Sequence, residues 1–182
     1  MPIQVIILNG GSSSGKSSIA RALQGLLPEP WLTFGVDDFV NALPPAMQNS
    51  EDGLVFLPDG SISVGPAIRR LREAWEGGIA AIARAGVGLI IDDVFLAGAT
   101  AQDRWRTALR DLRILWVGVR CDPLVAAQRE ARRGDRVPGM AVLQAELVHR
   151  DVACDLAIDS TNASPETCAR LIVDQIASAS VT

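Results

Sequence analysis

Short apolar runs alternate with helical patterns along most of the chain. The first run, residues 3–8, is rich in Ile and Val, is too short for a helix and ends at glycines. These properties are typical of a strand that is buried in a parallel sheet. Further strand-like runs occupy 31–36, 87–91, 114–119 and 155–158. Strands that alternate with helices predict an α/β fold, with a central parallel five-stranded sheet and helices on both faces.

Apolar residues at helical spacing follow these runs, and several of the helices that they predict have recognisable starts. Pro66 and Pro123 stand at first helical positions, and Ser164 is a candidate N-cap. A short helix is expected within 39–47. The longer expected helices cover 16–27, 65–85, 100–109, 140–149 and 164–177, and another begins at 122.

Residues 49–64 interrupt this alternation. Two short apolar segments, 54–57 and 61–64, flank Pro58-Asp59-Gly60, which is a good turn sequence between strands. We interpret this segment as an inserted hairpin that covers a substrate site. No repeat, low-complexity tract or linker divides the chain, so a single domain over 1–182 is expected.

One segment matches a phosphate-binding loop. Its residues, Gly10-Gly11-Ser12-Ser13-Ser14-Gly15-Lys16-Ser17, follow the pattern G-x-x-x-x-G-K-[ST] without departure, between an expected strand and an expected helix. Small residues let the backbone direct N–H groups at phosphate oxygens, and the helix N-terminus adds positive potential. Lys16 is expected at the β- and γ-phosphates and Ser17 on Mg²⁺. The motif predicts binding of a nucleoside triphosphate and leaves the reaction open.

Two expected strands end in pairs of carboxylates. Asp92 and Asp93 follow the run 87–91, as in a Walker B strand that supplies a magnesium ligand. Asp92 is preferred, because alternation along a strand turns Asp93 elsewhere. Asp37 and Asp38 follow the second strand, at the sheet edge where α/β proteins bind ligands. Either carboxylate is a candidate acceptor for the proton of an attacking hydroxyl group, and Asp38 is also a candidate helix cap.

Arginines gather after the fourth apolar run, in a segment that we interpret as a lid over about 126–140. Arginines on a lid stabilise charge on a transferring phosphoryl group and help to exclude water. Arg133 and Arg136 flank a bend and are the preferred catalytic arginines. Arg129 is an equally good candidate for a salt bridge with an acid such as Glu130.

Composition and charge narrow the class of protein. The chain has 182 residues, 48% of them hydrophobic and 21% charged, with a formal net charge of −4 and no Tyr. These values exclude a disordered, collagen-like or disulfide-rich chain. An acidic chain with few aromatic residues is not expected to bind nucleic acid. No apolar stretch reaches about 18 residues and no basic leader is present, so we expect a cytoplasmic protein without a membrane span.

Several longer stretches carry a more specific signal: 6–13 with 15–17, 27–32, 34–37, 90–96, 115–122, 133–137 and 139–141. They resemble the chloramphenicol phosphotransferase family, and the resemblance covers nearly the whole chain. It implies a P-loop kinase fold, related to that of nucleotide and shikimate kinases. It also implies ATP-dependent phosphorylation of the primary 3-hydroxyl group of chloramphenicol, with Asp37 as the general base.

This reading sets the expected partners. They are a small-molecule alcohol as acceptor, with ATP and Mg²⁺ as cofactors, and a homo-oligomer is left open. A kinase of another hydroxyl-bearing metabolite is the main alternative, and a regulatory nucleotide-binding ATPase is a further one. The expected pocket for the acceptor is formed by Val36, Asp37, Phe39, Met47, Asp92 and Phe95.

Overall fold

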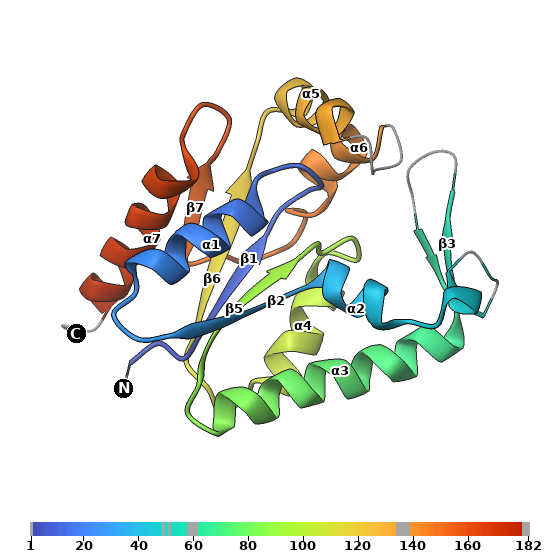
Figure 1. Ribbon diagram of the computed structural model, residues 1–182, viewed down its shortest axis with the longest axis horizontal. Coiled ribbons are helices and arrows are strands. Elements are labelled where there is room, and N and C mark those ends of the chain that lie inside the picture. Colours follow the sequence, from blue (N-terminus) through green and yellow to red (C-terminus); the bar gives the residue numbers. More distant parts are fainter. Residues whose placement is uncertain (1, 49, 51, 58–61, 134–138, 180–182) are drawn as a thin grey trace.

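Five parallel strands form the central sheet, in the order β2-β5-β1-β6-β7 (Figure 1). The computed structural model describes residues 2–48, 50, 52–57, 62–133 and 139–179. The strands are β1 Val5–Asn9, β2 Trp31–Gly35, β5 Gly88–Asp93, β6 Ile114–Arg120 and β7 Leu156–Asp159. The predicted five-stranded parallel sheet is therefore confirmed.

Helices cover both faces of this sheet because successive side chains of a strand point to opposite faces. Ile6 and Leu8 of β1 are buried in a cluster with residues of two helices, α1 and α7. Val5 and Ile7 are buried in a second cluster, with residues of α3 and α4. Figure 1 shows these two pairs of helices on either side of the sheet, with α5 and α6 near one end. The helices are α1 Lys16–Leu26, α2 Val36–Ala42, α3 Pro66–Arg84, α4 Ala99–Ala108, α5 Pro123–Arg133, α6 Met140–Leu147 and α7 Pro165–Ala179.

Helix α2 begins earlier than the sequence pattern predicts. Its first residue is Val36, so Asp37 and Asp38 lie in its first turn instead of preceding the helix. The Asp38 carboxylate Oδ2 accepts a hydrogen bond of 2.7 Å from the backbone N–H of Gly35, which stabilises this start. None of the described helices combines the length and the apolar character that crossing a membrane requires.

A two-stranded hairpin lies outside the main sheet, at the N-terminal end of α3 (Figure 1). Strand β3, Leu54–Phe56, pairs antiparallel with β4, Ile62–Val64, within the segment where the pattern predicts a hairpin. Its turn, residues 58–61, lies outside the described residues. Leu54 packs in a third apolar cluster with Phe39 of α2 and Ile68 of α3, so the hairpin is anchored beside α2.

Candidate active site

The loop between β1 and α1 has the tight backbone that its glycines allow. A Cβ atom on Gly10 would lie 2.6 Å from the carbonyl oxygen of Val119, so no larger residue fits there. Gly15 has a φ of 90° and precedes the first residue of α1. Ser13 also has a positive φ, 58°, which is uncommon for a residue with a side chain. The loop therefore has the compact shape that its motif predicts.

Three side chains meet at the start of α1. The Lys16 ammonium group is buried and donates a hydrogen bond of 2.9 Å to the carbonyl oxygen of Gly11. Its Nζ lies 3.6 Å from Asp92 Oδ1. Ser17 Oγ donates a hydrogen bond of 2.6 Å to Asp92 Oδ2. Two oxygen atoms that could ligate a metal ion, Ser17 Oγ and Asp92 Oδ2, thus lie side by side. Mg²⁺ prefers oxygen ligands of this kind.

Asp93 does not reach this group. Its Oδ2 accepts a hydrogen bond of 2.6 Å from the indole N–H of Trp105 in α4, and its Oδ1 accepts one from the backbone N–H of Val94. The alternation of side chains along β5 therefore directs Asp92 to the phosphate loop and Asp93 toward α4.

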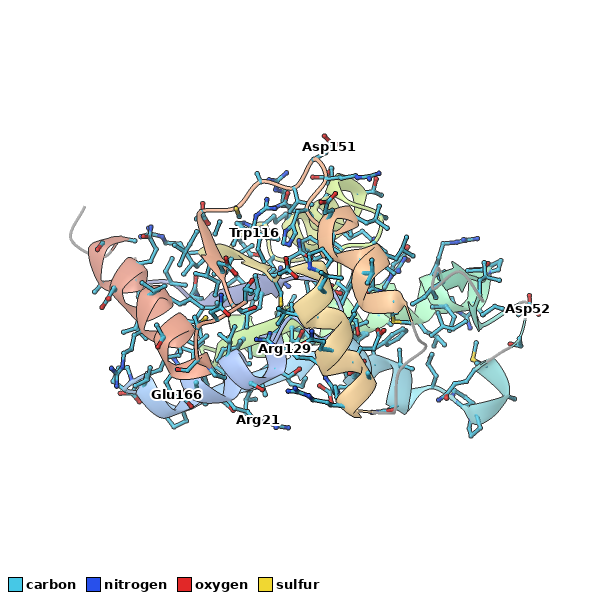
Figure 2. The ribbon with its side chains drawn as sticks, turned by 90° about the horizontal axis from the view of Figure 1, so that it is seen from above. Arg21, Asp52, Trp116, Arg129, Asp151 and Glu166 are labelled. Carbon is cyan, nitrogen blue, oxygen red and sulfur yellow. The ribbon has the colours of Figure 1, made fainter. Side chains whose placement is uncertain are left out.

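A cleft with a volume of about 880 Å³ opens beside these residues. Its walls come from the phosphate loop, β2, α2, the hairpin, the first half of α3, the segment after β5, α4, α5 and α6. Arg21 of α1 also lines it and extends from that helix in Figure 2. The candidate site residues that line this cleft are Ser12, Ser13, Gly15, Lys16, Ser17, Val36, Asp37, Phe39, Asp92 and Arg133.

Asp37 and Asp38 have different surroundings, although both border the cleft. The Asp38 carboxylate is engaged at the start of α2, as described above. Asp37 is exposed in the first turn of the same helix. Asp38 is exposed as well, so its contact with the backbone of Gly35 is the difference that the structure describes between the two carboxylates.

Two residues of the expected acceptor pocket lie elsewhere. Phe95 is fully buried and does not line the cleft. Its ring packs against Trp116, and its backbone N–H donates to Asn9 Oδ1. The extended chain after β5 turns its neighbours Val94 and Leu96 into the cleft instead. Met47 packs against the hairpin cluster and does not line the cleft. The expectation for Phe95 and Met47 was wrong.

In the arginine-rich segment, Arg129 makes contacts other than the salt bridge for which it is a candidate. Arg129 donates hydrogen bonds to the carbonyl oxygens of Ser160 and Thr161, at 2.8 Å and 3.1 Å, and so ties α5 to the segment after β7 (Figure 2). It forms no helical salt bridge with Glu130, because the buried Glu130 carboxylate accepts backbone N–H bonds from Gly139 and residue 141 at the start of α6. Arg136 lies outside the described residues.

Sequence reasoning missed two residues that support the loop. Gln144 of α6 is buried, and its Oε1 accepts a hydrogen bond of 2.9 Å from the backbone N–H of Ser12. The Ser160 hydroxyl lies 2.7 Å from the carbonyl oxygen of Ser14 and 3.0 Å from that of Arg120. The contacts of Gln144 with Ser12 and of Ser160 with Ser14 each join residues more than 130 positions apart in the chain, so no local pattern could reveal them.

A buried charge cluster on the cleft wall was also missed. Arg72 of α3 and Arg104 of α4 both line the cleft, and Glu76 of α3 lies between them. Arg104 Nε donates to Glu76 Oε1 at 3.2 Å, and Arg72 Nε is 3.9 Å from the same atom. Burial raises the pKa of Glu76, and burial together with the charge of Arg104 lowers the pKa of Arg72. The signal in the sequence is a pair of charges at positions 72 and 76 within the buried stripe of α3.

The fold and the loop place the chain in the P-loop kinase fold class. A sugar kinase from Janibacter sp. HTCC2649 is similar over 95% of this chain and 94% of its own, with a TM-score of 0.69 and 19% identity. Shikimate kinase from Acinetobacter baumannii, solved with shikimate, covers 99% of this chain and 96% of its own, at a TM-score of 0.63 and 17% identity. The Mycobacterium tuberculosis APS kinase, solved with AMPPNP and APS, has a TM-score of 0.63 and 16% identity, over 97% of this chain and 98% of its own.

Within this class, residues 3–177 match the family model of chloramphenicol phosphotransferase-like proteins. A Mycobacterium tuberculosis protein named "Putative O-phosphotransferase" is 32% identical, over 87% of this chain and 75% of its own length. The chain belongs to the chloramphenicol phosphotransferase-like family, and it is an O-phosphotransferase enzyme.

Proposed function

We propose that the protein transfers the γ-phosphoryl group of ATP to a hydroxyl group of a small molecule held in the cleft. The observation that carries the proposal is that one cleft is lined by the phosphate-loop residues Lys16 and Ser17, by the strand-end carboxylate Asp92 and by the exposed carboxylate Asp37. A phosphoryl donor and a hydroxyl acceptor bound there would lie beside both a cationic group and a base.

Each of these residues has a role in the proposal. Ser17 and Asp92 would hold Mg²⁺, which neutralises phosphate charge when it is bound. Lys16 exchanges its present contact with the Gly11 carbonyl for the β- and γ-phosphate oxygens. Asp37 accepts the proton of the attacking hydroxyl group as the oxygen–phosphorus bond forms and the bond to the β-phosphate breaks. Arg133, together with Arg136, is proposed to stabilise charge on the transferring group.

The acceptor that we propose first is chloramphenicol, phosphorylated on its primary 3-hydroxyl group, which inactivates the antibiotic. Family membership supports it. The apolar side of the cleft supports it as well, since an aryl body can be buried against side chains of α2, the hairpin and α3. Those residues are Phe39, Val40, Leu54, Ile62, Val64 and Ile68. We place the reaction in the cytoplasm, where ATP is available.

A hydroxyl-bearing metabolite is the second candidate acceptor. The observation that favours it is the pair of guanidinium groups, Arg72 and Arg104, on the same cleft wall. Guanidinium groups can donate hydrogen bonds to an anionic or strongly polar group of such an acceptor.

The decisive experiment is to incubate the protein with Mg²⁺, ATP and chloramphenicol and to search for the O-phosphate by mass spectrometry. A product 80 Da heavier than the acceptor, formed at a rate that depends on the acceptor concentration, supports the proposal. If ADP forms only with a different alcohol, the acceptor is a hydroxyl-bearing metabolite and not chloramphenicol. ADP release that is independent of any acceptor would point to a regulatory ATPase instead.

A further inference from the structure

The wall of the cleft formed by α3 and α4 holds two arginines around one carboxylate. Glu76 is 5% exposed, whereas the side chains of Arg72 and Arg104 keep 28% and 25% of their surface accessible. Arg72 and Glu76 follow Ile68 at intervals of four residues, so they continue the buried stripe of α3 past the cleft. The carboxylate is therefore the covered member of the cluster, and both Arg72 and Arg104 line the cleft.

Hydrogen-bond donors exceed acceptors in this cluster. Each guanidinium group has five N–H donors, whereas a carboxylate offers two oxygens. Arg104 Nε bonds to Glu76, but Arg72 Nε is buried without a hydrogen-bond partner among the described residues. The neighbouring Asp93 adds a negative charge, yet its two oxygens accept bonds from Val94 and Trp105. A buried donor without a partner costs stability. The parts of the Arg72 and Arg104 side chains that stay accessible could donate to an oxygen-bearing ligand in the cleft.

We propose that Arg72 and Arg104 form a carboxylate-binding subsite for the acceptor, which gives the second candidate acceptor, a hydroxyl-bearing metabolite, a chemical class: a hydroxy acid. The proposal rests on the proposed function, since it concerns the acceptor end of the same cleft. The planar fork of a guanidinium group matches the two oxygens of a carboxylate. A monoanion fits better than a phosphate dianion, because Glu76 and Asp93 already place two negative charges beside the two arginines.

The subsite also accounts for how a neutral antibiotic could be accepted. The aryl nitro group of chloramphenicol is planar and carries two oxygens, so it can occupy the position of a carboxylate. It lacks the net charge, and its hydrogen bonds with guanidinium groups are correspondingly weaker. We therefore expect a hydroxy acid of similar shape to bind more tightly than its neutral counterpart.

The test uses a matched pair of primary alcohols, 4-(hydroxymethyl)benzoate and 4-(hydroxymethyl)benzamide, with the full-length protein, Mg²⁺ and ATP. The two compounds have the same shape and differ in charge. We expect kcat/KM for the acid to exceed that for the amide by about tenfold or more, mostly through KM. Arg72→Gln and Arg104→Gln should each abolish most of this preference. The matched control is Arg106→Gln, which removes an arginine from α4 that pairs with Asp103 and does not line the cleft.

The ratio of kcat/KM for the acid to kcat/KM for the amide, measured on one variant, does not depend on a general loss of activity in that variant. A binding measurement tests the subsite even if neither alcohol is phosphorylated. In that measurement benzoate and benzamide are titrated while the side-chain Nε–Hε signals of the arginines are followed by NMR. Benzoate should shift the Arg72 and Arg104 signals, and benzamide should not. Arginine-dependent benzoate binding without turnover of either alcohol would uphold the subsite and refute the proposed function. An acid preference that survives both substitutions, or arginine signals that benzoate leaves unmoved, would overturn the subsite.

Discussion

Replacing Glu130 by Gln tests whether a buried carboxylate connects the lid region to the phosphate loop. The Glu130 carboxylate is 5% exposed and accepts backbone N–H bonds from Gly139, at 2.9 Å, and Ala141, at 2.8 Å. These groups lie at the N-terminus of α6, where a negative charge is also favourable to the helix dipole. The same helix carries Gln144, which holds the backbone of the loop at Ser12.

The size of the effect follows from these two bonds. An amide keeps one oxygen acceptor, and its NH2 group then faces the second backbone N–H. One charge-assisted hydrogen bond contributes about 1.5 to 3 kcal/mol, and the charge at the helix terminus contributes about 0.3 to 1 kcal/mol. We therefore expect Glu130→Gln to lower the free energy of unfolding by about 2 to 4 kcal/mol. For a chain of this length the melting temperature should fall by about 5 to 10 °C.

Urea unfolding and thermal unfolding measure this change, and steady-state kinetics measure its effect on the site. Glu130→Gln should raise KM for ATP, because α6 then supports the loop less firmly. Glu146→Gln is the matched control, since Glu146 is an exposed residue of the same helix. If Glu130→Gln lowers the free energy of unfolding by less than about 0.5 kcal/mol, as a surface substitution does, Glu130 does not have this stabilising role.

Three further predictions concern single side chains. Asp37→Asn should lower kcat by about 10² to 10⁴ with nucleotide affinity preserved, and turnover that survives within about threefold would exclude Asp37 as the base. Asp92→Asn should raise the Mg²⁺ concentration for half-maximal activity by about tenfold or more, whereas Asp93→Asn should leave it unchanged; equal effects would contradict the assignment of the metal to Asp92. Burial, with the nearby charge of Arg120, lowers the pKa of His149, so its protonation opposes folding and the free energy of unfolding should decline as pH falls below 6.5. His149→Gln should flatten that decline in urea titrations, and an unchanged pH profile would contradict the prediction.

Much of the site's chemistry follows from local patterns. The phosphate loop, the strand-end Asp92 and the start of α1 lie within short segments whose residue types predict a role. Asp37 could be placed beside the cleft because parallel strands end at the same edge of a sheet. Phe95 was misplaced for a related reason: it lies three residues after Asp92, where the chain has left the strand and alternation no longer tells which side a ring takes.

The alternation of strands and helices was determined by the sequence itself, since each element depends on the spacing of apolar residues within a few turns or strand positions. The tertiary structure alone decided which distant groups meet. Gln144 contacts Ser12 across 132 positions of the chain, and Arg104 reaches Glu76 from a different helix. Such contacts depend on how helices pack against the sheet, and that packing is the combined result of the whole core. The sequence therefore predicts a phosphate-binding loop, and the packing decided which distant residues line the cleft beside it.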